Sequence, residues 1–423
     1  MPRFSTLADW LAWQETLHPR KIDLGLERVM RVAERMQLLA PGHCVITVAG
    51  TNGKGSSVAM LESILSSGGY RVGCYSSPHL LRYNERIRIA GDEIDDAALC
   101  AAFESVDRAR GDDTSLSYFE FGTLAALSLF SQAQLDIAIL EVGMGGRLDA
   151  VNILDADAAL VTSIDIDHSA WLGEDREAIG REKAGIFRPG QPAVCSDPEP
   201  PASVFKHARA VSARWYAAGH SFDWSTSEHG WNWRSHDRRF QDLPLPALPG
   251  SHQLQNAAGV LMVLDVLAER FPLQRRDIER GLQAVALAGR CQPLPGTIET
   301  LLDVAHNPGS AEKLAHLLRD RGVRGRTRMV LGMLSDKDAA AFTAVLSPVV
   351  DDWYLATLPG ERGLSAEQLQ QLLRGSSEHG MLRLFEDVET ACRQAHADAV
   401  DGDRVVVSGS FVTVAEALLW SKR

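Results

Sequence analysis

The sequence lacks any long apolar segment. None of its 423 residues lies in a run that approaches the roughly 18 uninterrupted apolar residues of a membrane span. The stretch from Met1 to Trp10 contains Asp9 and has no apolar core of a signal peptide. We therefore expect a cytoplasmic protein that has no membrane partner.

Cysteines are few and isolated. None of the six belongs to a C-x-x-C pair, which argues against a zinc or thiol-redox site. Their apolar surroundings predict that most of them are reduced core residues; the six are Cys44, Cys74, Cys100, Cys195, Cys291 and Cys392.

Positive charge is also scarce. The chain has 43 lysines and arginines against 55 acidic residues, a formal net charge of −12. This balance argues against a nucleic-acid partner, because such proteins neutralise phosphates with clustered basic side chains. Small anionic substrates remain possible, since local backbone N–H groups, a few basic side chains and a metal can hold them.

Apolar residues make up 45% of the chain, which is enough for a large core, and the length suggests two or three domains. In the first half, short β-branched runs alternate with helical patterns, as is typical of βαβ units and a mostly parallel sheet. The expected strands lie at 45–49, 71–75, 136–141 and 158–163, and the expected helices at 57–67, 119–130 and 174–183.

The pattern of residue types changes after residue 214. Aromatic and polar residues alternate over 215–240, which predicts a small antiparallel hairpin unit before a helix at 253–269. Glycine and proline at 286–296 indicate the main linker. Beyond it we expect a smaller Rossmann-like α/β domain, so the predicted domains are 1–287 and 288–423, the second with strands at 298–304, 329–333, 353–356 and 404–408.

The strongest local motif is G-T-N-G-K-G-S, residues 50–56, placed between an expected strand and an expected helix. Glycines let successive N–H groups turn toward one anion, the helix N-terminus adds positive charge, and Lys54 can reach the β- and γ-phosphates. Ser56 is a candidate hydroxyl at the same site. The loop departs from the usual phosphate-loop pattern at Val48 and Gly55, and a plain glycine turn with a solvated Lys54 is the alternative.

Two residues follow expected strands at the edge where nucleotides bind. Glu141 ends one strand and suits a nucleotide-bound Mg²⁺, whereas His168 follows the next strand and is an unusual ligand for this ion. A structural hydrogen-bonding role is the alternative for His168. The residues around Lys183 favour an ordinary surface lysine paired with Glu182.

Ten segments in order resemble the folylpolyglutamate synthase and dihydrofolate synthase family, a branch of the Mur-ligase superfamily. They extend from about Ile22 to Ala415 and read I-D-L-G-L-E-R-V, G-T-N-G-K-G-S, S-S-P-H-L-L-R-Y-N-E-R-I, F-E-F-G-T, L-E-V-G-M-G-G-R-L-D-A, D-H-S-A-W-L-G, E-K-A-G-I-F, H-Q-L-Q-N-A-A, D-V-A-H-N-P and S-G-S-F-x-T-V. The resemblance implies an N-terminal phosphate-loop ATPase domain and a C-terminal glutamate-ligase domain.

The resemblance also implies site residues. ATP would contact Asn52, Gly53, Lys54, Gly55, Ser56, Asn256, Arg290, Asp303 and His306. Mg²⁺ would be bound by Ser77, Glu141 and His168, and Lys183 would be carbamylated, which reverses the surface-lysine interpretation. The pterin pocket would comprise Asp23, Leu24, Gly25, Phe119, Glu120, Leu148 and Asp149.

Several of these residues have simpler interpretations. Asp303 and His306 could cap a strand and start the helix after Pro308, Asn256 could be a polar residue on a helix face, and Phe119 could be a core aromatic.

The implied activity is an ATP- and Mg²⁺-dependent ligase, expected to be a monomer, that adds L-glutamate to dihydropteroate and to tetrahydrofolate glutamates through an acyl phosphate. In this mechanism Lys54 and His168 are the candidate catalytic residues, together with modified Lys183. The alternatives are a monofunctional folylpolyglutamate synthase, a Mur-type cell-wall ligase and a non-catalytic nucleotide switch.

Overall fold

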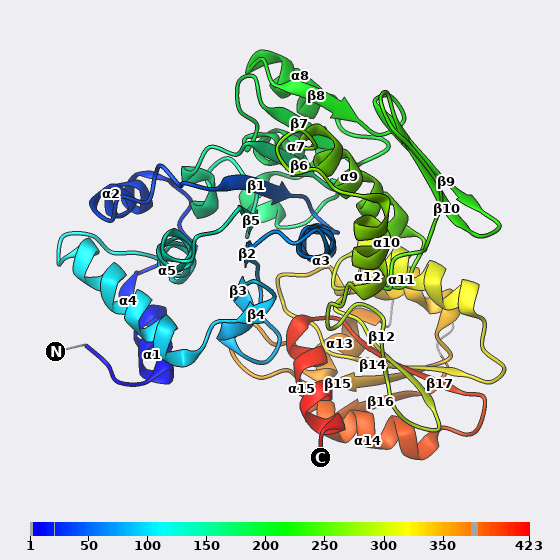
Figure 1. Ribbon diagram of the computed structural model, residues 1–423. Coiled ribbons are helices and arrows are strands. Elements are labelled where there is room, and N and C mark those ends of the chain that lie inside the picture. Colours follow the sequence, from blue (N-terminus) through cyan, green and yellow to red (C-terminus); the bar gives the residue numbers. More distant parts are fainter. Residues whose placement is uncertain (1–2, 21, 374–379) are drawn as a thin grey trace. The chain divides into compact units, whose positions relative to one another are not determined.

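The computed structural model describes residues 3–20, 22–373 and 380–423. The fold is mixed α/β, as expected, and the chain divides into two compact units (Figure 1). The first unit comprises Met1–Ala247 and Leu254–Val285, and the second comprises Leu248–Gln253 and Ala286–Arg423. In the described ranges, no helix is both long enough and apolar enough to cross a membrane.

The described part of the first unit contains a large sheet of eight strands in the order β4-β3-β2-β5-β1-β6-β7-β8. The strands from β2 to β8 along this order are parallel, and β3 and β4 form an antiparallel edge. In chain order the strands are β1 (Cys44–Ala49), β2 (Val72–Tyr75), β3 (Ile87–Ile89), β4 (Asp92–Glu93), β5 (Ile137–Glu141), β6 (Ala158–Val161), β7 (Pro192–Cys195) and β8 (Arg214–Ala217).

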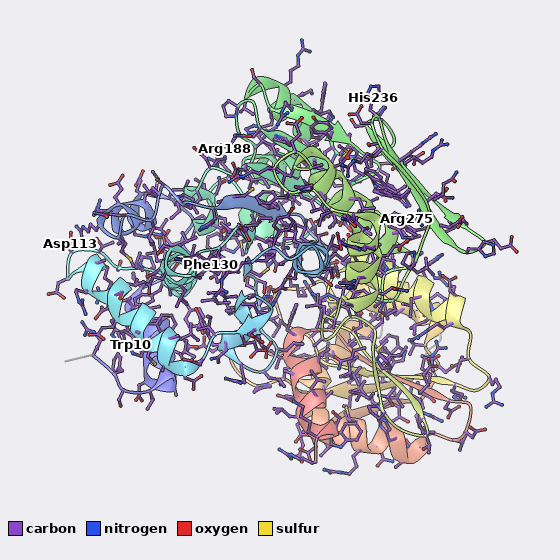
Figure 2. All side chains as sticks on the ribbon, viewed as in Figure 1. Trp10, Asp113, Phe130, Arg188, His236 and Arg275 are labelled. Carbon is purple, nitrogen blue, oxygen red and sulfur yellow. The ribbon has the colours of Figure 1, made fainter. Side chains whose placement is uncertain are left out.

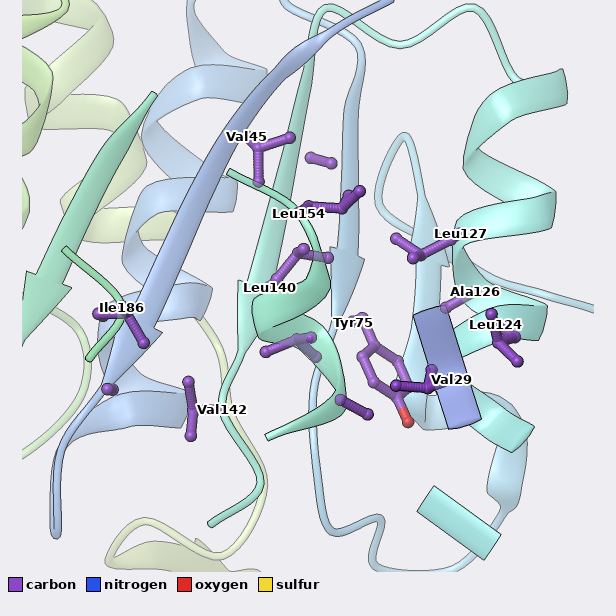
Figure 3. Packing of buried hydrophobic residues seen from close by; sticks show 14 of the residues in the cluster. Val29, Val45, Tyr75, Leu124, Ala126, Leu127, Leu140, Val142, Leu154 and Ile186 are labelled. Carbon is purple, nitrogen blue, oxygen red and sulfur yellow. The ribbon is translucent and has the colours of Figure 1, made fainter. Parts of the chain in front are cut away.

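Helices cover both faces of this sheet, which explains why its central strands are apolar without alternation. Val45 and Leu140 pack with Leu127 of α5 in one cluster, which Figure 3 shows from close by. Leu160 of β6 faces the other way, where a Cβ on Gly259 of α9 would lie 3.1 Å from its side chain. The helices of the first unit are α1 (Leu7–Leu17), α2 (Glu27–Arg35), α3 (Lys54–Ser67), α4 (Asp96–Arg110), α5 (Tyr118–Gln132), α6 (Ser169–Leu172), α7 (Arg176–Ala184), α8 (Ala202–Ala210), α9 (His252–Val266, whose first two residues group with the second unit) and α10 (Arg275–Ala284).

An aromatic cluster joins three helices of the first unit. Trp10 of α1, labelled in Figure 2, is fully buried. Its ring centroid lies 6.0 Å from that of Phe103 in α4 and 6.3 Å from that of Phe121 in α5. Because Phe121 follows Phe119 and Glu120, this cluster anchors the start of α5.

The antiparallel hairpin unit is confirmed, with one correction. It consists of β9 (Phe222–Ser227), β10 (Gly230–Ser235) and β11 (Arg239–Leu243), and Trp233 donates its indole N–H to the carbonyl of Ala258 at 3.1 Å. Trp215, which the sequence assigned to the hairpins, instead lies in β8 and pairs with Ala193 of the large sheet. The segment is an edge strand there, so it has the mixed polarity of a hairpin.

The second unit has a mixed sheet, with six strands in its described residues, in the order β12-β13-β17-β14-β15-β16. Only β12 pairs antiparallel, and it occupies part of the stretch expected to be a linker. The strands are β12 (Gln292–Leu294), β13 (Glu299–Leu302), β14 (Thr327–Leu331), β15 (Asp352–Ala356), β16 (Leu382–Phe385) and β17 (Arg404–Ser408); the helices are α11 (Pro308–Arg321), α12 (Ala339–Leu346), α13 (Ala366–Leu373), α14 (Val388–Asp398) and α15 (Phe411–Ser421).

Candidate functional site

Several candidate residues of the first unit lie at the carboxyl ends of four neighbouring parallel strands. In the sheet β2 pairs with β5, β5 with β1, and β1 with β6. In the same order, Ser77 follows β2, Glu141 is the last residue of β5, the loop 50–53 follows β1 and the stretch 162–168 follows β6. Ligands of open α/β sheets collect at this edge.

The glycine loop has no space for side chains at two positions. A Cβ atom on Gly50 would overlap the hydroxyl of Thr162, and one on Gly53 would overlap the amide oxygen of Asn256. Gly53 also has a left-handed φ of +90° immediately before α3 begins at Lys54. The loop therefore follows the backbone path that aims N–H groups and a helix N-terminus at one point.

Hydroxyl groups after β6 hold this loop in place. The carbonyl of Asn52 accepts hydrogen bonds from Thr162 Oγ1 at 2.7 Å and from Ser163 Oγ at 3.0 Å, and the Thr51 N–H donates to the Ser163 carbonyl at 2.7 Å. A Thr-Ser pair at a strand end carries no local signature, so the sequence alone gives no reason to assign a role to these two hydroxyl residues.

The ammonium of Lys54 lies over the same loop. Its Nζ donates to the carbonyls of Gly50 at 3.0 Å and Thr51 at 3.3 Å. Ser56, in the first turn of α3, is buried. The loop thus combines a localised positive charge with a helix N-terminus, which is the arrangement expected for phosphate groups.

Oxygen ligands for a divalent cation lie beside the loop. The buried carboxylate of Glu141 accepts a hydrogen bond from the Ser77 N–H at 3.2 Å, so the structure brings these two candidates together. The described residues contain no group of three or more His, Cys, Asp and Glu side chains that could hold a metal. One carboxylate and one hydroxyl nevertheless fit Mg²⁺, which binds few protein ligands and completes its shell with waters and phosphates.

His168 follows β6 at the same edge. It has a left-handed φ of +53° at the start of α6, and its backbone N–H donates to Asp167 Oδ1 at 2.8 Å. A left-handed backbone is strained for a residue with a side chain. His168 lies seven residues beyond the end of β6, and its role as a metal ligand stays a prediction.

Lys183 is buried at the end of α7, so its interpretation as a surface lysine paired with Glu182 is wrong. Glu182 instead pairs with Arg147, at 3.0 Å. Burial and the nearby charge of Lys54 lower the pKa of Lys183 to about 7, against the opposing influence of Asp167 and Asp149. The amine is therefore partly neutral near pH 7.

Asp149 is the second buried titratable group here. Burial raises the pKa of its carboxyl to about 7, although backbone N–H groups of Met144 at 2.8 Å and Val151 at 3.1 Å donate to it and Lys54 favours its charged form. Perturbed groups that influence one another electrostatically are typical of functional sites.

The candidate pterin residues lie in three segments: the loop before α2, the start of α5 and the loop after β5. Asp23, Leu24 and Gly25 lie in the half-buried loop before α2, and the Arg28 guanidinium links Asp23 to Glu120 in α5. The Phe119 ring lies 5.7 Å from that of Tyr75 and against Gly143, so Phe119 also packs as a core aromatic. Half-buried Leu148 precedes Asp149 in the loop after β5.

Asn256 belongs to the first unit, whereas Arg290, Asp303 and His306 belong to the second. Asp303 accepts from the N–H groups of Cys291 at 2.9 Å and Ala305 at 2.8 Å. The Arg290 guanidinium and the His306 imidazole both lie near the ring of Phe411. The guanidinium carbon is 5.5 Å from the Phe411 ring centroid, and the imidazole centroid is 6.2 Å from it.

Asn307 caps α11 in the second unit. Its Oδ1 accepts from the Ser310 N–H at 2.8 Å, so neither Asp303 nor His306 provides this side-chain cap. The suggestion that these two residues start the helix is therefore wrong, although Asp303 does hold the turn after β13.

Comparison with known proteins gives consistent matches over the whole chain. Residues 48–264 match the Mur ligase middle domain, and residues 289–411 match the Mur ligase glutamate ligase domain. The dihydrofolate synthase/folylpolyglutamate synthase of Escherichia coli K12 is 48% identical over 98% of this chain and 95% of its own length.

Solved structures agree with this result. Escherichia coli FolC in complex with DHPP and ADP has a TM-score of 0.93 and 48% identity, covering 98% of this chain and 97% of that one. A bifunctional folylpolyglutamate synthase/dihydrofolate synthase with Mn, AMPPNP and L-glutamate bound has a TM-score of 0.90 and 50% identity, with 98% of both chains covered. The chain therefore belongs to the dihydrofolate synthase/folylpolyglutamate synthase family of ATP-dependent Mur ligases.

Proposed function

We propose that this chain joins L-glutamate both to dihydropteroate and to the glutamate tail of tetrahydrofolate. Glutamate ligation with ATP is the activity of its family, and the relatives described above carry both synthase names. The observation that carries the proposal is the meeting of the phosphate loop, Ser77 and Glu141 at one sheet edge. A phosphate loop beside ligands for a divalent cation can bind ATP and allow a carboxylate to be phosphorylated.

The chemistry follows from the weakness of a carboxylate as an acyl donor. The substrate carboxylate oxygen attacks the γ-phosphorus of ATP, the bond to the β-phosphate oxygen breaks, and an acyl phosphate and ADP form. The glutamate amine then attacks the acyl carbon, loses a proton, and inorganic phosphate leaves. A divalent cation at Ser77 and Glu141 supplies neutralisation of phosphate charge when bound.

The protein's own groups position and stabilise these steps. Lys54 and the loop N–H groups neutralise charge on the transferring phosphoryl group, so no covalent protein nucleophile is needed. We assign the ATP phosphates to Asn52, Gly53, Lys54, Gly55 and Ser56, the rest of ATP to Asn256, Arg290, Asp303 and His306, Mg²⁺ to Ser77, Glu141 and His168, and the pterin to Asp23, Leu24, Gly25, Phe119, Glu120, Leu148 and Asp149.

We further propose that Lys183 is carbamylated. A lysine pKa of about 7 leaves a neutral amine that can attack carbon dioxide and then release a proton. The product is an anion, and it would relieve the repulsion between Lys183 and the ammonium of Lys54.

We propose a Mur-ligase-like domain with the phosphate loop in residues 1–287 and a glutamate-ligase domain in residues 288–423. The family matches at 48–264 and 289–411 support this division. We also propose a cytoplasmic monomer with no nucleic-acid or membrane partner. Light scattering of the purified chain would measure its mass directly.

The decisive experiment measures ADP release with ATP, Mg²⁺ and glutamate, with dihydropteroate, tetrahydrofolate or a cell-wall precursor as acceptor. Mass spectrometry of the products then identifies the added glutamate. We expect turnover with both pterins. Turnover with tetrahydrofolate alone would reduce the proposal to a monofunctional folylpolyglutamate synthase. Turnover with the cell-wall precursor alone would replace it by a Mur-type ligase, and nucleotide binding without any product by a nucleotide switch.

A further inference from the structure

Arg28 connects two segments that are far apart in the sequence. It lies in the first turn of α2, where Nη1 donates to Asp23 Oδ2 at 2.6 Å and Nη2 donates to the Asp23 carbonyl at 2.8 Å. The same Nη2 also donates to Glu120 Oε1 of α5 at 3.1 Å. One planar guanidinium therefore holds both the loop before α2 and the first turn of α5.

The Asp23 side of this connection is reinforced by a histidine. His18 Nε2 lies 3.1 Å from Asp23 Oδ2, and His18 Nδ1 lies 2.9 Å from the hydroxyl of Ser115. Burial alone would raise the pKa of Asp23, but the hydrogen bond from His18 and the charges of Arg28 and Arg20 outweigh it and lower the pKa. Asp23 is thus an ionised, fixed carboxylate near neutral pH.

On the other side of Arg28, both carboxylate oxygens of Glu120 accept hydrogen bonds within the protein. Its Oε2 accepts the Ser117 N–H at 2.7 Å and closes a capping box at the start of α5, while Oε1 accepts from Arg28. Only 5% of the Glu120 side chain is exposed. Without Arg28, a buried carboxylate would lose its positive partner, which is strongly unfavourable.

Neighbouring pocket residues depend on the same two segments. Leu24 and Gly25 follow Asp23 directly, and Phe119 precedes Glu120. A flat pterin ring requires walls at a fixed separation, and a displacement of about 1 Å can reduce turnover about a hundredfold. A lysine cannot replace this contact, because an ammonium is a point donor without the planar fork of arginine.

We propose that Arg28 is a positioning residue for the pterin acceptor, setting the separation of the Asp23–Gly25 and Phe119–Glu120 segments. The inference rests on the proposed function, since it concerns the pocket assigned there. Arg28 acts through Asp23 and Glu120 and touches no reacting atom.

The test compares Arg28→Gln and Arg28→Lys with Arg35→Gln. Arg35 ends the same helix, and its guanidinium likewise makes a two-point contact with Asp113, at 3.0 and 2.6 Å, and bonds the carbonyls of Ala109 and Arg110. Loss of a charged hydrogen-bonded contact predicts that KM for dihydropteroate rises about tenfold or more in both Arg28 variants. KM for ATP should stay unchanged, and Arg35→Gln should alter neither.

Thermal unfolding of all three variants separates positioning from folding. If Arg28→Gln fails to fold, the charge-conserving Arg28→Lys provides the measurement. An unchanged KM for dihydropteroate in Arg28→Lys, or equal rises for dihydropteroate and ATP, would overturn the inference while leaving the proposed function intact. A wild-type chain that uses no pterin acceptor would overturn both.

Discussion

Gly53 and Asn256 are in direct contact, although 203 residues separate them in the sequence. A Cβ atom on Gly53 would overlap Oδ1 of Asn256 and lie 3.1 Å from its Cγ. The backbone of Gly53 also has a φ of +90°, which L side chains rarely adopt. Two independent constraints therefore exclude a side chain at Gly53, the position directly before α3.

We predict that Gly53→Ala impairs nucleotide binding beyond its effect on stability. Gly69→Ala is the matched control, because Gly69 has a φ of +86° at the other end of α3 but no atom within 4 Å of an added Cβ. Both variants should lose about 1–2 kcal/mol of unfolding free energy to the left-handed backbone. ADP affinity, measured by titration calorimetry, should fall only in Gly53→Ala; equal affinities in the two variants would contradict the prediction.

Carbamylation of Lys183 can be observed without any assay of activity. Protein equilibrated with ¹³C-bicarbonate should give a carbamate carbon signal by NMR, because an amine with a pKa of about 7 is mostly neutral at pH 8. The signal should vanish in Lys183→Ala and persist in Lys206→Ala, whose lysine is exposed. A signal that survives Lys183→Ala would place the modification elsewhere.

Asp149 should make stability fall with rising pH in the metal-free protein. Its carboxyl pKa is about 7 in the folded chain against 3.8 as the ordinary value, so the folded state holds more protons between these limits. Unfolding free energy from this group therefore decreases from about pH 4 to pH 7. In denaturant unfolding, the unfolding free energy of Asp149→Asn should increase relative to that of wild type as the pH rises from about 4 to 7. A difference in unfolding free energy that does not change with pH would disprove the raised pKa.

The role of His168 can be separated into metal binding and proton transfer. If it is a ligand, His168→Ala should weaken Mn²⁺ binding measured by electron paramagnetic resonance, and turnover should recover partly at high Mn²⁺. His236→Ala is the control, because His236 lies exposed on the hairpin unit and is labelled in Figure 2. Intact Mn²⁺ affinity with lost turnover would make His168 a base toward the glutamate amine instead.

Much of the fold was predictable because it depends on local pattern. The apolar runs at β1 and β5 are buried on both faces. A short apolar run between turn signals is typical of such a buried strand. The short, polar strand β4 and the edge strand β8 were missed, since an edge strand exposes one side and loses the periodic signal.

For the candidate site, too, the residues that the sequence predicted are those with a local pattern. The glycine loop was predicted from contiguous residues, and Glu141 from its place at a strand end. Thr162, Ser163 and Arg28 were not found, because a hydroxyl or a guanidinium acquires its role from partners that are distant in the chain.

The sequence by itself determined where the backbone turns and which residues can begin a helix, because glycine, proline and apolar periodicity act over a few neighbouring residues. Tertiary structure alone decided that Lys183 is buried, that its pKa falls to about 7 and that the pKa of Asp149 rises to about 7. Desolvation depends on every atom packed around a charge, and those atoms come from strands and helices throughout the first unit.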